Sequence, residues 1–146
     1  MKIKQLSLFL ENKPGALSRP VRLLADARIN IMTLSVADSS QFGILRLILC
    51  DWEPAMKLLE KNGFVVKVTD MVAVEVADHA GGLARILELI EKADLNVEFM
   101  YAFTEKRARQ AVLIFRFDDP DLAVLTLQRR GIKTVGDEEL LQGVEA

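Results

Sequence analysis

The feature that most constrains this fold is an internal repeat. Residues 10–31, LENKPGALSRPVRLLADARINI, align without a gap to residues 76–97, VADHAGGLARILELIEKADLNV. A second block follows after a two-residue shift, where GILRLILCDWEPAMKLLEKNG aligns to AVLIFRFDDPDLAVLTLQRRG. Two copies are too few for a solenoid, so the repeat predicts a pair of similar domains. In the first block, the identical residues include Gly15/Gly81, Leu17/Leu83, Arg19/Arg85, Ala27/Ala93 and Asn30/Asn96.

Composition narrows the class of protein. Apolar residues make up 51% of the 146-residue chain, which is enough to form a core. The net charge of −2 and the dispersed basic residues argue against direct nucleic-acid binding. No apolar run approaches the roughly 20 residues of a membrane span, so we expect no membrane association. A lone Cys50 cannot form an internal disulfide, which favours a cytoplasmic protein.

Each copy is predicted to begin with a strand, a glycine turn and a helix. Alternation in IKQLSLFL places its leucines on one face of a half-buried strand, and MVAVEVA repeats the pattern. Pro20 would remove an early hydrogen bond if the first helix began at Ala16, so we expect either a start near Ser18 or a loosened first turn. The apolar stripe of the first helix is predicted to be Leu17, Val21 and Leu24, widened by Leu23 and Ala27. In the second copy it is Leu83, Leu87 and Ile90, widened by Ile86 and Ala93.

Two strands, a second helix and a short closing strand are predicted to complete each copy. In the second copy Asp119 can cap this helix, Pro120 fits its first turn and Gly131 ends it. Asp51, Pro54 and Gly63 are predicted to play the same parts in the first copy. The closing strands are FVVKVT and IKTV.

The order strand–helix–strand–strand–helix–strand, written twice, predicts an α+β fold. It indicates two ferredoxin-like βαββαβ sandwiches in tandem, each an antiparallel sheet with helices on one face. The predicted domains are residues 1–69 and 70–146. The joint at Thr69 and Asp70 is too short for a flexible linker.

Convergent catalytic groups are scarce in the sequence. Cys50 and His79 are the only obvious reagents, they lie in different copies, and neither has nucleophile or metal-ligand spacing around it. We therefore predict no catalytic residue, no metal and no cofactor, and we interpret Cys50 as a small apolar residue. The basic turn EKRARQ is interpreted as a solvated hairpin tip, because no aromatic residue is interleaved with it.

The glycine turns are the remaining candidates for function. Asn12 can form a turn, Pro14 fixes a backbone angle, and Gly15 permits close approach. Such a turn presents backbone N–H groups at a helix start, where they attract a carboxylate or phosphate. The residues alone leave two interpretations open, a binding turn or a strand-to-helix connection that needs glycine.

The combination of NKPGAL, a helix and RINI inside a βαββαβ unit resembles the ACT domain, the amino-acid-sensing module of many metabolic regulators. DHAGGL followed by DLNV resembles a second one, so nearly the whole chain resembles a tandem ACT protein. The second turn departs from the family pattern, since Ala80 stands where a proline is usual and His79 adds a titratable group.

This resemblance implies where a ligand binds. In ACT domains the strand-to-helix turn of one domain holds a small amino acid, with help from the following strand of its neighbour. Backbone N–H groups near Gly15 or Gly81 would take the ligand carboxylate. The implied ligand-binding residues are Asn12, Lys13, Pro14, Gly15, Ala16, Leu17, Asn30 and Ile31 in the first copy, and Asp78, His79, Ala80, Gly81, Gly82, Leu83, Asn96 and Val97 in the second.

We therefore expect a non-catalytic, allosteric regulatory protein that binds an amino acid effector, forms a homodimer and modulates a separate metabolic enzyme or regulator. Glycine, serine, a branched-chain or an aromatic amino acid all fit the residues. The alternative is an assembly subunit of a metabolic enzyme with no ligand of its own. A small enzyme that uses Cys50 and His79 is a third hypothesis.

Overall fold

A computed structural model describes residues 1–38, 40–103 and 110–142, and it confirms the repeated βαββαβ order. The chain divides into two units, which are described separately below. The N-terminal unit comprises Lys4–Thr69. The C-terminal unit comprises Asp70 onward together with Met1–Ile3.

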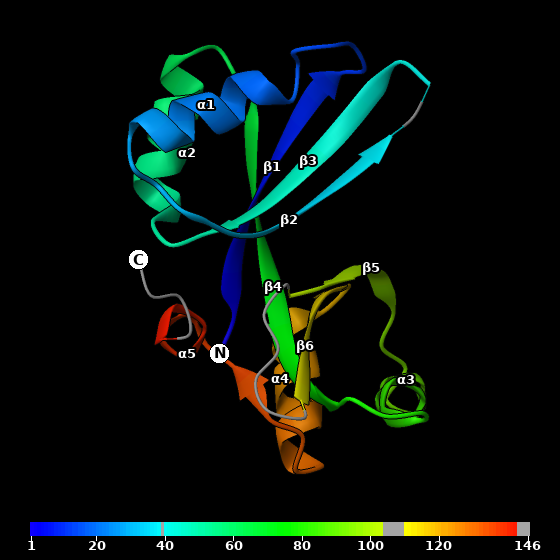
Figure 1. Ribbon diagram of the computed structural model, residues 1–146. Coiled ribbons are helices and arrows are strands. Elements are labelled where there is room, and N and C mark those ends of the chain that lie inside the picture. Colours follow the sequence, from blue (N-terminus) through cyan, green and yellow to red (C-terminus); the bar gives the residue numbers. More distant parts are fainter. Residues whose placement is uncertain (39, 104–109, 143–146) are drawn as a thin grey trace. The chain divides into compact units, whose positions relative to one another are not determined.

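The N-terminal unit contains two helices on one face of its sheet (Figure 1). Its strands are β1 (Ile3–Glu11), β2 (Ile31–Asp38), β3 (Phe42–Leu49) and the start of β4 (Val66–Ala77), in the order β2-β3-β1-β4. The helices are α1 (Ser18–Asp26) and α2 (Trp52–Lys61). Of the two alternatives for the first helix, the structure shows the start at Ser18.

The core of the N-terminal unit follows the strand alternation. In the antiparallel pair β1–β3, Leu6 lies opposite Leu47 and Leu8 opposite Leu45, and all four side chains are fully buried. Leu24 of α1 packs onto this leucine layer, as do two residues of α2. The predicted leucine face of the first strand is therefore confirmed.

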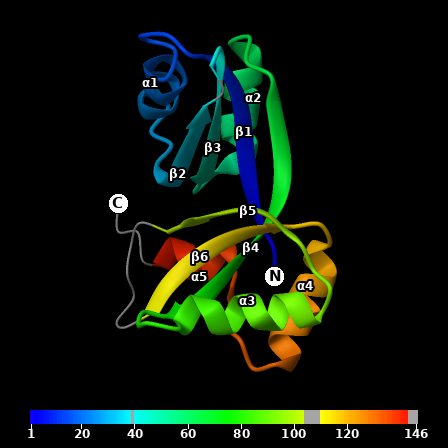
Figure 2. The same cartoon turned by 90° about the vertical axis from the view of Figure 1, so that its right-hand side faces the viewer.

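The C-terminal unit repeats this architecture (Figure 2). Its strands are the rest of β4, β5 (Val97–Ala102), β6 (Gln110–Phe117) and β7 (Thr134–Val135), with β4 between β6 and β7. Its helices are α3 (Gly82–Lys92), α4 (Pro120–Arg129) and the short α5 (Asp137–Gln142). No helix in the described part of the chain is long and apolar enough to cross a membrane.

The core of the C-terminal unit corrects the predicted stripe of α3. Ile86 and Ile90 are buried against Val74 and Phe115, but Leu83 and Leu87 each remain 37% exposed. The apolar arc of α3 is wider than the surface that the sheet offers it. The prediction that Leu83 and Leu87 are core residues was therefore wrong.

Two further expectations needed correction. The closing strand of the first copy and the opening strand of the second form one continuous strand, β4, which runs through Thr69 and Asp70. Asp51 precedes α2, but its side chain makes no capping hydrogen bond, whereas the Asp119 carboxylate accepts one from the Leu122 N–H at 3.1 Å. The basic turn EKRARQ lies outside the described residues, except for Gln110 at the start of β6.

Candidate functional site

A cleft of about 300 Å³ lies beside the first glycine turn, where β1 passes into α1. Gly15 has φ +86°, a left-handed conformation that favours glycine, and a Cβ there would meet no atom within 4 Å. The cleft therefore has room directly over the backbone of the turn. Its lining includes Phe9, Glu11, Lys13, Gly15, Arg19 and Phe64.

Backbone N–H groups of the turn remain available to a ligand. The Ala16 N–H donates to the Lys13 carbonyl at 3.2 Å, and the Arg19 N–H donates to the Gly15 carbonyl at 3.2 Å. In the described part of the chain, the N–H groups of Gly15 and Leu17 have no hydrogen-bond acceptor. Free N–H groups at a helix start favour an anionic group such as a carboxylate.

Arg19 brings a fixed positive charge to the cleft. Its guanidinium donates to the Asn62 carbonyl at 2.9 Å and lies 4.7 Å from the centre of the Phe64 ring. Both contacts come from the segment that follows α2, so tertiary structure orients this side chain. A guanidinium that retains free donors can bind a ligand carboxylate.

Glu11 and Lys13 form an ion pair at the same cleft. Lys13 Nζ lies 2.8 Å from Glu11 Oε2, and this lysine lowers the pKa of Glu11 by hydrogen bonding and by charge. The Glu11 carboxylate therefore remains ionised to a lower pH than usual. The cleft thus combines cationic groups and N–H donors with one carboxylate, the pattern that a zwitterionic amino acid requires.

The predicted residues of the first copy divide between two places. Residues Asn12 to Leu17 form the turn, with the Asn12 N–H bonded to the Gln41 carbonyl at 2.9 Å. Asn30 and Ile31 line a separate cleft of about 350 Å³ at the other end of α1. Nine helical residues span about 13 Å, so a single unit does not bring the turn and these two residues together.

The second turn, residues Asp78 to Leu83, is built differently. Gly81 has φ +91°, and Nδ1 of His79 lies 2.9 Å from the Ala80 carbonyl oxygen. A Cβ at Gly82 would collide with the Ala77 carbonyl oxygen, so the helix start lies tightly against the end of β4. Gly82 is buried, whereas Ala16, its counterpart in the first copy, lines the cleft.

The second turn also lacks the ion pair of the first. Glu11 and Lys13 correspond in the repeat to Ala77 and His79, so the ion pair has no counterpart. Asn96 and Val97 line another cleft, of about 460 Å³, at the far end of α3. The Asn96 N–H donates to the Asp118 carboxylate at 3.0 Å, which fixes the start of β5.

Sequence reasoning missed five residues that line the first cleft, namely Phe9, Leu10, Glu11, Arg19 and Phe64. Arg19 carried a signal, because it is identical to Arg85 in the repeat and follows Gly15 by one helical turn. Nothing in the sequence indicated a role for Phe64, since its approach to Arg19 depends on how α2 packs. Glu11 shows its role only through its ion pair with Lys13.

Cys50 lies just after β3 in a partly buried position, with its N–H 3.4 Å from the Asn30 carbonyl oxygen. Burial, with a contribution from Asp51, raises the pKa of the Cys50 thiol. A raised pKa disfavours the nucleophilic thiolate. Among the described residues, no group of three or more His, Cys, Asp or Glu is placed to hold a metal ion.

Comparisons with known proteins agree with this architecture. The family model described as an ACT domain pair matches residues 1–144. The crystal structure of protein BT0572 from Bacteroides thetaiotaomicron is similar over 96% of each chain, with 34% identity and a TM-score of 0.90. A search of curated proteins found no match.

Two more distant structures share the fold. The ligand-free regulatory subunit of aspartate kinase from Thermus thermophilus has a TM-score of 0.62 at 14% identity, covering 86% of this chain and 91% of that one. The corresponding subunit from Thermus flavus has a TM-score of 0.59 at 15% identity, covering 86% and 90%.

Proposed function

Because this chain belongs to the family of ACT domain pairs, we propose that it is a non-catalytic regulatory protein that binds a small amino acid and acts on a separate metabolic enzyme or regulator. The regulatory subunits from the two Thermus species have the same fold, which supports a regulatory role. We place the protein in the cytoplasm, in keeping with its single, partly buried cysteine.

The observation that carries this proposal is the cleft at the first turn. Its free N–H groups and Arg19 would bind the carboxylate of an amino acid, and Glu11 would face its ammonium group. The exposed Phe9 and the Phe64 ring supply apolar surface for a side chain. A volume of about 300 Å³ suits a small amino acid.

We propose that the second turn does not bind a ligand. Gly82 lies against the Ala77 carbonyl, and the positions of the Glu11–Lys13 pair hold Ala77 and His79. In the first copy, the predicted residues Asn12 to Leu17 would form the site together with Glu11 and Arg19. Asn30 and Asn96 would contribute only from a neighbouring unit.

Thermal unfolding of the full chain in the presence of each common amino acid tests the proposal. A ligand at 100 times its dissociation constant adds about 2.7 kcal/mol, which raises Tm by about 5 °C or more in a chain of this size. We expect one amino acid or a small class of them to produce the shift.

Matched variants locate the site. Arg19→Gln should abolish the shift, and Arg85→Gln, the same change at the equivalent position of the second copy, should preserve it. Gly15→Val and Gly81→Val form a second matched pair for the same comparison. The two glycines have similar surroundings, because both have positive φ and open space around a Cβ. A shift lost with Arg85→Gln would contradict the assignment, and no shift with any amino acid would favour an assembly subunit.

A further inference from the structure

The ion pair between Glu11 and Lys13 occupies a place that the proposed function assigns to the ligand. The Glu11 carboxylate would face the ammonium group of a bound amino acid, yet its Oε2 atom already lies 2.8 Å from Nζ of Lys13. Both ammonium groups carry one positive charge and three N–H donors. The lysine therefore holds the carboxylate in the same way as the ligand would.

The Lys13 side chain can leave this contact without disturbing the turn. The backbone of Lys13 is held separately, because its N–H donates to the Glu11 carbonyl at 3.0 Å and its carbonyl accepts from the Ala16 N–H at 3.2 Å. Both side chains of the pair are 63% exposed, so water would solvate the lysine ammonium as soon as it is released. Displacing Lys13 therefore costs only an exposed ion pair.

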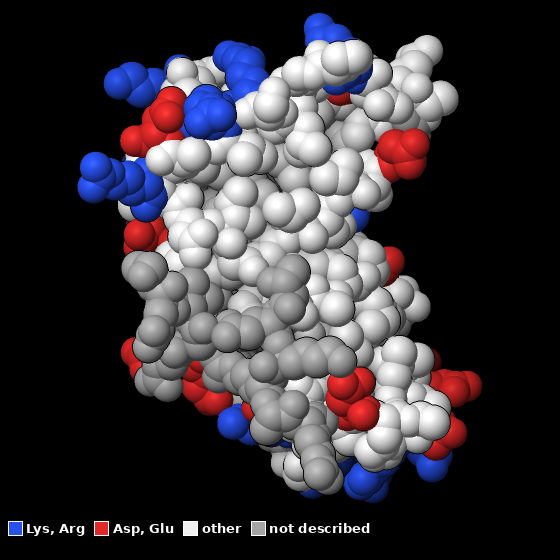
Figure 3. Space-filling model, in the orientation of Figure 1, with Lys and Arg blue, Asp and Glu red and all other residues white. Residues whose placement is uncertain are grey.

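Arg19 keeps a positive charge in the cleft when Lys13 leaves. Its contacts with the Asn62 carbonyl and the Phe64 ring do not involve the ion pair. Figure 3 shows several blue basic side chains and a small patch of red at the end of the N-terminal unit where β1 passes into α1. The carboxylate of a ligand therefore has a cationic partner whichever ammonium group binds Glu11.

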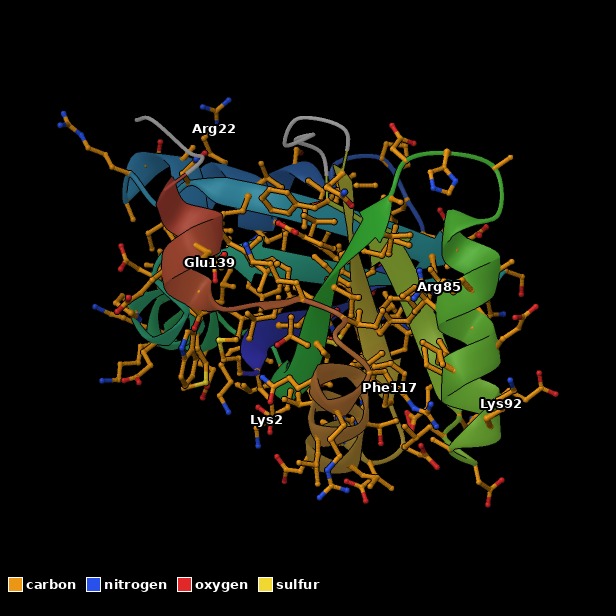
Figure 4. The ribbon with its side chains drawn as sticks, turned by 90° about the horizontal axis from the view of Figure 1, so that it is seen from below. Lys2, Arg22, Arg85, Lys92, Phe117 and Glu139 are labelled. Carbon is orange, nitrogen blue, oxygen red and sulfur yellow. The ribbon has the colours of Figure 1, made fainter. Side chains whose placement is uncertain are left out.

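The second copy lacks this arrangement. Ala77 and His79 take the places of Glu11 and Lys13 in the repeat. Arg85, the equivalent of Arg19, is labelled near the start of α3 in Figure 4. The second turn thus has the arginine but neither the carboxylate nor a lysine beside it, so competition between two ammonium groups is confined to the first copy.

We propose that Lys13 competes with the ammonium group of the ligand for Glu11, and thereby limits how strongly the cleft prefers an amino acid to a carboxylic acid of the same carbon skeleton. This role for Lys13 rests on the proposed function. An amino acid exchanges one exposed ion pair for another, so its ammonium group gains little. A carboxylic acid without an ammonium group leaves the Glu11–Lys13 pair in place and binds through its carboxylate alone.

The test is isothermal titration calorimetry on the full chain. It compares each amino acid that raises Tm with its analogue lacking the amino group, such as alanine with propionate or phenylalanine with 3-phenylpropionate. Lys13→Gln should lower the dissociation constant of the amino acid about two- to fivefold, the range expected for an exposed ion pair, and should not tighten the analogue. Arg22→Gln removes a positive charge from a side chain of α1 that points away from the ribbon in Figure 4, and it should tighten neither ligand.

A Glu11→Gln background separates competition from a general effect of charge. Loss of a positive charge acts whether or not the carboxylate is present, whereas competition requires it. Glu11→Gln alone should weaken binding of the amino acid, and the E11Q/K13Q double variant should bind it no more tightly than E11Q does.

The outcomes distinguish this role from the proposed function. If Lys13→Gln weakens amino acid binding or leaves it unchanged, or tightens it equally with and without Glu11, the competition is overturned and the proposed function stands. If no amino acid binds to either the wild type or the K13Q variant, the proposed function fails and the competition fails with it.

Discussion

At the residue scale, the charged side chains around the first turn are held in place by neighbouring residues. Arg19 is fixed by the Asn62 carbonyl and the Phe64 ring, and Glu11 by Lys13. The second copy retains only the arginine, as Arg85. Differences at positions 77, 79 and 82 therefore contribute to the contrast between the first turn, which has a charged, open cleft, and the second.

Cys50 differs from a catalytic cysteine in its ionisation. Its thiol pKa lies above the ordinary value of 9.0, because burial and Asp51 both disfavour the thiolate. At neutral pH the thiolate is therefore less populated than in an ordinary cysteine. The environment supports the interpretation of Cys50 as a small, partly buried residue.

We predict that Cys50 reacts with iodoacetamide more slowly than free cysteine at neutral pH. Its rate should continue to rise with pH through 9, since the thiolate population grows until the raised pKa is passed. The measurement is the alkylation rate between pH 6 and pH 10, followed by mass spectrometry. A rate that reaches its plateau near pH 7 would support the enzyme hypothesis instead.

At the element scale, the two copies cap their second helices differently for a reason visible in the sequence. An N-cap carboxylate accepts a hydrogen bond from the N–H two or three residues into the helix. In α4 that donor is Leu122, which bonds Asp119 at 3.1 Å. In α2 the equivalent position is Pro54, which has no N–H.

The expected consequence is an asymmetric cost of removing the caps. Asp119→Ala should destabilise the protein by about 1 kcal/mol, because it leaves the Leu122 N–H without its acceptor. Asp51→Ala should cost less than half of that, since no capping bond is lost. Urea unfolding of both variants checks this, and equal losses would show that the bond contributes nothing.

At the scale of the whole molecule, the repeat produced two units with the same fold and different surfaces. Their cores are equivalent, built around leucines in one unit and around valines, isoleucines and phenylalanines in the other. Some charges on the corresponding helices are reversed, since Arg22 and Arg28 of the first copy correspond to Glu88 and Asp94 of the second.

The sequence by itself determined the fold and the location of the turns. Strand alternation, helix periodicity and the residues that end helices depend on neighbours a few positions apart, so they can be recognised without a structure. The leucine face of β1, the start of α1 at Ser18 and the cap at Asp119 were all predictable in this way. The repeat then doubled each signal, which made the βαββαβ order clear.

Only the tertiary structure decided which turn has an open cleft and which apolar residues remain exposed. The contacts of Arg19 join segments 43 residues apart, and the crowding of Gly82 depends on how α3 begins against the end of β4. Leu83 and Leu87 fit a core-facing stripe by periodicity, yet the sheet covers only Ile86 and Ile90 beside them. Local patterns specify which elements form, whereas available space depends on how distant elements pack.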